Sequence, residues 1–231
     1  MMTSDRIYKY EMHIHTASCS GGGSDIRDHI DVLMQKGYSG MVVTNHFYAG
    51  DNRIDRELPW REFVDAYRQD YLYGLEYAKT VGFDLLFGLE EHVGGGQEIL
   101  IYGITPELIA EHTELKRASA EKFVEVVHAA GGLVYQAHPY RARDYISNPF
   151  PLDCLDLLDG IEVYNAGNEP EWNESARIFA EERGIACIAG SDGHKIGTAG
   201  CAGIATKERI ACNDDLVRIL KNNEYTVFIN E

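Results

Sequence analysis

The sequence predicts an α/β protein built on a parallel sheet, most simply closed into a barrel. Short apolar segments alternate with amphipathic ones along the 231 residues, which is the pattern of repeated strand–helix units. The strand segments, such as MVVT, GLVYQA and IACIAG, are apolar on both faces, as buried parallel strands are. An open doubly wound sheet is the alternative, although no GxGxxG motif follows a strand. One α/β barrel would use the whole length, so we expect a single domain over residues 1–231.

Each predicted strand is a short apolar segment. The predicted strands are Ile7–His15, Gly40–His46, Asp84–Glu90, Glu98–Ile104, Gly132–His138, Gly160–Asn165, Ile185–Ser191 and a late one at Tyr225–Ile229. Between them, apolar residues at helical spacing followed by glycine predict helices; Ile26, Ile30 and Leu33 form such a stripe, which Gly37 ends. The predicted helices are Ser24–Lys36, Trp60–Val81, Ser119–Ala130, Ala176–Arg183 and Asp214–Asn222.

The charge balance restricts the class of partner. The chain has 21 basic and 37 acidic residues, a formal net charge of −16. Long nucleic acid and anionic membranes both need an excess of Lys and Arg, so we expect neither as a partner. A small phosphorylated substrate remains compatible, because bound metal ions can invert the local field.

Cysteine content and hydropathy indicate a reduced, cytoplasmic protein. The five cysteines include no CxxC pair, which argues against a disulfide framework or a zinc ribbon. The segment Met1 to Tyr10 lacks the apolar run of a signal peptide. No stretch approaches the roughly 18 apolar residues of a membrane span.

Side chains that bind metals stand at the ends of the predicted strands. His13 and His15, two residues apart at the end of the first strand, point to one face. In a barrel the carboxyl ends of the strands converge on one mouth, where active sites lie. Imidazole and carboxylate suit Zn, Mn or Fe, and a bridging carboxylate suits a site with several metals. The predicted metal ligands are His13, His15, His46, Glu90, His138, Asp192 and His194.

Each of these residues taken alone has a simpler explanation. His46 or His138 is compatible with a hydrogen-bonded buried histidine, and Glu90 beside Glu91 with a solvated loop pair. Asp192 in SDG is compatible with a turn. The combination favours a metal site, because the simpler explanations must place every one of them at a strand end by accident. The remaining histidines in helical segments are interpreted as structural or exposed: His29, His112 and His128.

The same residues lie in motifs that resemble those of the PHP (polymerase and histidinol phosphatase) domain family. EMHIHT, VVTNH, GLE, QAHP, GIEVYN and GSDGH follow one another in the family order between Glu11 and His194. The resemblance implies a small, stand-alone member with a single distorted (β/α)7-type TIM-like barrel and a metal-dependent phosphoesterase activity. It implies one metal held by His13, His15, Glu90 and Asp192. It further implies that His46 and His194 help hold another metal, and that Glu90 with His138 forms a third or bridging position.

Three departures from the family pattern concern the additional metal. Many members have an acid or a histidine shortly after HxHT, where this chain has Cys19 and Ser20 in ASCSGGG. The family's TDH is TNH here, with Asn45 in place of an acid that could orient the following histidine. Many members also have a histidine in the fourth strand, near Leu100. Cys19 and His92 are therefore the candidates for an additional ligand.

The predicted chemistry is hydrolysis of a small phosphate ester, a phosphomonoester or a short nucleotide. Two or three divalent ions (Zn, Mn or Fe) are expected; two of them about 3.5–4 Å apart would bridge a water and present hydroxide to phosphorus. We expect Glu90, Asp192 and His194 to be catalytic. Arg141 and Lys195 are expected to bind the phosphate, Arg141 first because guanidinium matches phosphate bidentately.

Two other functions remain open. A metal-dependent amidohydrolase that cleaves a C–N bond also opens with HxH, but typically adds a bridging lysine from a mid-barrel strand, and none of the middle predicted strands contains lysine. The second alternative is a catalytically inactive metal-binding regulatory module. A decayed site should have lost several ligands, whereas this chain keeps seven.

Overall fold

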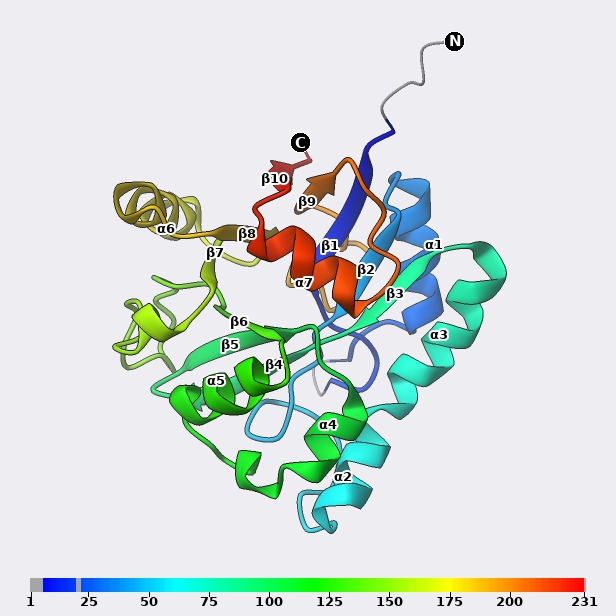
Figure 1. Ribbon diagram of the computed structural model, residues 1–231, viewed down its shortest axis with the longest axis horizontal. Coiled ribbons are helices and arrows are strands. Elements are labelled where there is room, and N and C mark those ends of the chain that lie inside the picture. The colour runs from blue at the N-terminus through cyan, green and yellow to red at the C-terminus, as the bar shows by residue number, and fades with distance from the viewer. Residues whose placement is uncertain (1–5, 20–21, 231) are drawn as a thin grey trace.

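The centre of the molecule consists of two five-stranded sheets (Figure 1). The computed structural model describes residues 6–19 and 22–230. The first sheet has the order β10-β9-β1-β2-β3 and the second the order β4-β5-β6-β7-β8. The strands of the first sheet are β1 (Tyr8–Ile14), β2 (Gly40–Val43), β3 (Asp84–Phe87), β9 (Ala202–Thr206) and β10 (Tyr225–Ile229). Those of the second are β4 (Leu89–Gly94), β5 (Gln97–Tyr102), β6 (Leu133–Gln136), β7 (Gly160–Asn165) and β8 (Cys187–Gly190).

The predicted single closed barrel of parallel strands is not confirmed. Pairing is parallel within β1-β2-β3 and within β6-β7-β8, but antiparallel along β4-β5-β6 and along β1-β9-β10. The two sheets are connected by isolated bridges between Ile14 and Gly193 and between His46 and Glu90. The β4–β5 pair is antiparallel because the two strands form a hairpin, which needs no helical crossover.

The predicted strand Asp84–Glu90 is divided between the two sheets. Gly88 separates β3 from β4, and a Cβ atom at Gly88 would lie 2.8 Å from both the Ile101 carbonyl oxygen and Val42 Cγ1. Only glycine therefore fits where the chain passes from one sheet to the other. This passage places Glu90 next to the end of β2 rather than in line with β3.

Seven α-helices in the described residues cover the sheets. They are α1 (Ile26–Gln35), α2 (Trp60–Tyr67), α3 (Gln69–Val81), α4 (Pro106–Glu111), α5 (Ala120–Ala129), α6 (Pro170–Arg183) and α7 (Asn213–Lys221). Two 3-10 helices, Thr113–Leu115 and Leu155–Leu157, complete the set. The predicted helix Trp60–Val81 is two helices that meet at Arg68, and α6 begins six residues before the prediction, at Pro170. Neither α4 nor β9 was predicted.

The apolar core lies away from the carboxyl ends of β1 and β6. Tyr10 and Tyr102, both fully buried, pack with Leu216 of α7 in one cluster, and α7 crosses in front of the strands in Figure 1. On the other side of the first sheet, the stripe of α1 packs against Met41. The polar residues at the carboxyl ends of the strands are thus held above a packed apolar base. No helix in the described part of the chain has the length and apolar character needed to cross a membrane.

The packing of α1 gives a direct test of this arrangement. Leu33 is fully buried, whereas its neighbour Met34 is 39% exposed. We expect Leu33→Ala to lower the free energy of unfolding by about 2–5 kcal/mol, because it removes buried apolar contacts and leaves a cavity. Met34→Ala, the control, should change it by less than about 0.5 kcal/mol. Urea denaturation measures both, and equal losses would contradict the packing of this helix face.

Candidate metal centre

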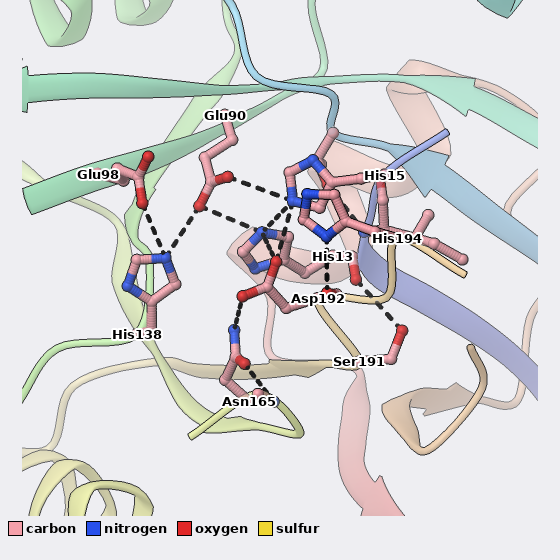
Figure 2. A network of polar contacts seen from close by, with 12 residues as sticks. His13, His15, Glu90, Glu98, His138, Asn165, Ser191, Asp192 and His194 are labelled. Atoms are coloured by element: carbon pink, nitrogen blue, oxygen red, sulfur yellow. Dashed lines mark hydrogen bonds and ion pairs between the residues drawn. The ribbon is translucent and has the colours of Figure 1, made fainter. Parts of the chain in front are cut away.

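Two histidines at the end of β1 form one side of the centre: His13 within the strand and His15 directly after it. His13 and His15 are both fully buried, and their Nε2 atoms lie 3.2 Å apart. They share a direction because alternate residues of a strand point to the same face. Opposite them lie Glu90 from β4 and Asp192, which follows β8 (Figure 2). The structure brings these four side chains together.

The spacing within this first donor set, defined as His13, His15, Glu90 and Asp192, matches ligands around one ion. Nε2 of His13 lies 3.2 Å from Oε1 of Glu90 and 3.5 Å from Oδ1 of Asp192. Nε2 of His15 lies 3.3 Å from Oε2 of Glu90 and 3.0 Å from the same Oδ1. Four nitrogen and oxygen ligands in a tetrahedron at about 2.0–2.1 Å from zinc stand about 3.3–3.4 Å from one another. The donor atoms therefore fit a divalent transition ion.

A second donor group surrounds the other side of Glu90. Nδ1 of His46 lies 2.9 Å from Oε2 of Glu90 and 3.6 Å from Oε1 of Glu98. Nε2 of His138 lies 3.0 Å from Oε1 of Glu90 and 3.2 Å from Oε2 of Glu98. Single donor atoms of His46, Glu90 and Glu98 lie within 4.8 Å of one another, and His138 contacts the other oxygen of each carboxylate. The second donor group thus consists of His46, His138, Glu90 and Glu98, and it shares Glu90 with the first.

Glu98 is the residue of this group that sequence reasoning missed. The family position for a strand histidine was sought near Leu100, which is fully buried and packs in the apolar core with Tyr10 and Tyr102. Glu98 lies two residues earlier on the same strand face, near the amino end of β5, which antiparallel pairing sets beside the carboxyl ends of β4 and β6. The signal in the sequence that could have identified Glu98 is its position as a charged residue at the start of the apolar run EILIYG.

A third group contains Cys19. Single donor atoms of His15, Cys19 and His194 all lie within 4.8 Å of one another. The Cys19 sulfur is fully buried, lies 3.4 Å from Nδ1 of His15 and accepts the backbone N–H of His46 at 3.3 Å. The sulfur is therefore placed either as a ligand or as a partner that orients the His15 ring. Ser20, the other candidate in this segment, lies outside the described residues.

Two predicted residues lie apart from these groups. Nε2 of His92 accepts the backbone N–H of Gly96 in the β4–β5 hairpin, and none of the donor groups formed by the described residues includes His92. Lys195 is exposed in the loop after His194. Of the other histidines, His29 is buried in α1, and His112 and His128 pair with surface carboxylates.

A buried layer of polar residues holds the ligands in place. Oε1 of Glu162 lies 3.0 Å from Nδ1 of His13, while its Oε2 accepts the backbone N–H of His138 at 2.9 Å. Oε1 of Glu11 accepts the backbone N–H groups of His13 and Ser191, which fastens β1 to the loop that carries Asp192. Neither glutamate was predicted, although both stand in the strand motifs EMHIH and GIEVYN.

Asn45 holds the turn after β1 rather than the ring of His46. Its Oδ1 accepts the backbone N–H of Thr16, and its Nδ2 donates to the hydroxyls of Thr16 and Ser18, all at 2.7 Å. An amide serves here because it donates and accepts at once, which a carboxylate does not. The replacement of the family's acid therefore stabilises the Thr16–Cys19 turn.

The electrostatic environment of the centre favours bound positive charge. Burial disfavours the charged imidazole of His13, yet Glu162, Glu90 and Asp192 hold its pKa well above the usual value. Burial likewise disfavours the charged carboxylate of Glu90, but His13 and His46 hold its pKa well below the usual value. Burial lowers the pKa of His194 to about 4, which leaves this ring neutral near pH 7. Buried carboxylates surrounded by imidazoles are the environment that suits bound cations.

Arg141 and Asp192 are fixed to each other beside the first donor set. Nη2 of Arg141 donates to Oδ2 of Asp192 at 2.8 Å and to Oδ1 of Asn165 at 2.9 Å, while its Nε donates to Asn168. This leaves Oδ1 of Asp192 facing the histidines. Asp192 and His138 have φ values of 51° and 28°, a left-handed backbone that other residues than glycine adopt at a cost. The surrounding hydrogen bonds, such as Asp192 N–H to the His13 carbonyl at 2.8 Å, hold this geometry.

Glu162 tests whether the buried layer tunes the ligands. We expect Glu162→Gln to weaken Mn(II) or Zn(II) binding by about 10–100-fold, because the ring of His13 loses a charged acceptor while keeping its place. Calorimetric titration of the metal-free protein measures the change. Glu182→Gln, at an exposed position of α6, is the matched control. Unchanged affinity in Glu162→Gln would show that the contact has no influence on the centre.

Residues 170–225, from α6 to the start of β10, match the model of the PHP-associated family. No curated protein matches the chain in sequence. A two-domain protein from Bacteroides vulgatus that contains a predicted PHP-like metal-dependent phosphoesterase superimposes with a TM-score of 0.71 at 14% identity. The match covers 97% of this chain and 65% of that protein.

Two further solved structures share the fold. An amidohydrolase from Chromobacterium violaceum, with bound sulfate and no metal, has a TM-score of 0.61 at 16% identity, covering 95% of this chain and 97% of that one. The lesion-specific endonuclease PfuEndoQ from Pyrococcus furiosus has a TM-score of 0.67 at 12% identity, covering 96% of this chain and 58% of that one. The chain thus spans less than two thirds of the Bacteroides protein and of the endonuclease. At these identities the likeness shows a common fold.

Proposed function

We propose that the chain belongs to the PHP-domain family, as its motifs implied, and that it is a metal-dependent phosphoesterase that hydrolyses a small phosphate ester. The observation that carries the proposal is the first donor set, in which two imidazoles and two carboxylates stand at the spacing of ligands around one ion. Divalent ions at such a centre lower the pKa of water and withdraw charge from phosphoryl oxygens.

The exposure of the donors indicates where a substrate approaches. His13, His15 and Glu90 are fully buried, whereas the side chains of His46 and Asp192 are 14% and 10% exposed. A phosphate group therefore reaches the centre from the side of His46 and Asp192. We propose that Glu90 is the shared carboxylate of the centre, and that Asp192 and the neutral ring of His194 border the reacting group.

The two alternatives differ in what they hydrolyse. Hydrolysis of a C–N bond stays an alternative, because the Chromobacterium amidohydrolase shares the fold of this chain. Against it, the ion pairs that Glu90, Glu98 and Asp192 make with the described residues involve histidines and Arg141 but no lysine. A catalytically inactive metal-binding module would bind ions and cleave neither class of bond.

Metal content and hydrolysis together test the proposal. We expect about two or three transition ions per purified chain by elemental analysis, and hydrolysis of p-nitrophenyl phosphate or a short nucleotide that stops on chelation and returns with Mn(II) or Zn(II). Asp192→Asn should lose at least one ion and the activity, because it removes a ligand charge. Asp153→Asn, an exposed carboxylate, is the control. Cleavage of amides in place of phosphate esters, or of neither, would refute the phosphoesterase.

Arg141 has a second role besides the predicted phosphate anchor. Its side chain is 10% exposed and its guanidinium is bound to Asp192, so we propose that it orients that carboxylate. Lys195 stays a predicted phosphate-binding residue in the exposed loop that follows His194.

Steady-state kinetics separate the two roles of Arg141. We expect Arg141→Met to lower kcat and metal affinity together, about 10–100-fold in affinity, because Asp192 loses its partner. Arg143→Met, on the exposed part of the same loop, should leave both within about twofold. A rise in KM alone, with full metal content, would instead identify Arg141 purely as a substrate anchor.

A further inference from the structure

The second donor group repeats the chemistry of the first. Each of its two imidazole nitrogens lies within 3.6 Å of an oxygen from both of its carboxylates. Figure 2 shows Glu98 and Glu90 directed toward the same edge of the His138 ring. Two imidazoles and two carboxylates are again a donor set that suits Mn, Fe or Zn.

Two buried atoms in this group lack the bonds that their burial requires. Oε2 of Glu90 and Nδ1 of His46 face each other at 2.9 Å, yet neither makes a hydrogen bond with any described residue. A buried polar atom left without a partner costs about 1–3 kcal/mol, so such atoms are normally satisfied. A cation accepting lone pairs from both atoms would satisfy them without a hydrogen bond between them.

We propose that Glu98 is a metal ligand that completes a second ion site with His46, His138 and Glu90. The proposal deepens the proposed function and rests on it, because it assigns a ligand to the same centre. Glu98 supplies a carboxylate where many family members have a strand histidine. Its side chain is 13% exposed, so this position lies on the side from which a substrate approaches.

The hairpin explains why Glu98 rather than Glu91 takes this position. Antiparallel pairing sets Glu90 opposite Leu100 and His92 opposite Glu98, so that Glu98 stands on the same face as Glu90. Glu91 points to the other face, where its Oε1 accepts the backbone N–H of Ala49 at 2.8 Å. The two adjacent glutamates of the GLEE segment are therefore not interchangeable.

Ion stoichiometry and Mn(II) electron paramagnetic resonance test the ligand without relying on activity. Wild-type protein reconstituted with Mn(II) should show an exchange-coupled spectrum, because Glu90 belongs to both donor groups and would be a ligand of both ions. Glu98→Gln should hold one ion fewer per chain and give the spectrum of uncoupled Mn(II). Glu98→His should keep the ion, since imidazole is also a ligand, and it serves as a second variant if Glu98→Gln fails to fold. Glu111→Gln, an exposed carboxylate of α4, is the control and should match the wild type.

The outcomes separate this ligand from the proposed function. A folded Glu98→Gln with the wild-type ion count and a coupled spectrum would overturn the assignment of Glu98 and leave the phosphoesterase intact. A wild type that holds coupled ions, loses one in Glu98→Gln and cleaves no phosphate ester would support Glu98 and refute the function. A wild type that binds no ion would overturn both.

Discussion

The fully buried carboxylate of Glu90 is the constraint around which the centre is arranged. Its two oxygens face the rings of His13, His15, His46 and His138 at 2.9–3.3 Å. A buried charge is tolerated only with compensating charge and hydrogen bonds. Three strand ends must therefore deliver four imidazoles to one point, and this requirement determines how the two sheets approach each other.

The layer behind the ligands serves the same requirement. Glu162 and Glu11 receive backbone and ring N–H groups from both sheets, and Arg141 fixes one oxygen of Asp192 so that the other faces the histidines. Each of these contacts reduces the number of conformations that a metal-ligating side chain can adopt before any ion binds. The left-handed backbone at Asp192 and His138 is stabilised by that layer.

The predictable part of this molecule is the part encoded by local spacing. A two-residue repeat placed His13 and His15 on one face, and strand ends located Glu90, His138 and Asp192. The direction of strand pairing is not local, because it depends on how distant segments dock, and so neither the β4–β5 hairpin nor the role of Glu98 followed from the pattern. The division of the predicted strand at Gly88 could not be predicted for the same reason. A short apolar run has the same sequence pattern whether it belongs to one sheet or to two. The closed barrel was inferred from alternation alone, which does not specify pairing direction.

The arrangement of the sheets along the chain has a consequence for assembly. The second sheet is a continuous segment, Leu89–Gly190, inserted between β3 and β9 of the first sheet. His13, His15 and His46 belong to the interrupted sheet, whereas Glu90, Glu98 and His138 belong to the insert. Neither sheet alone carries a complete set of donors. High-affinity ion binding therefore requires that the inserted sheet packs against the first sheet, and not only that each sheet folds. Ions bound between donors of both sheets would link the two sheets, and removing those ions would weaken the contact between the sheets before it unfolds either one.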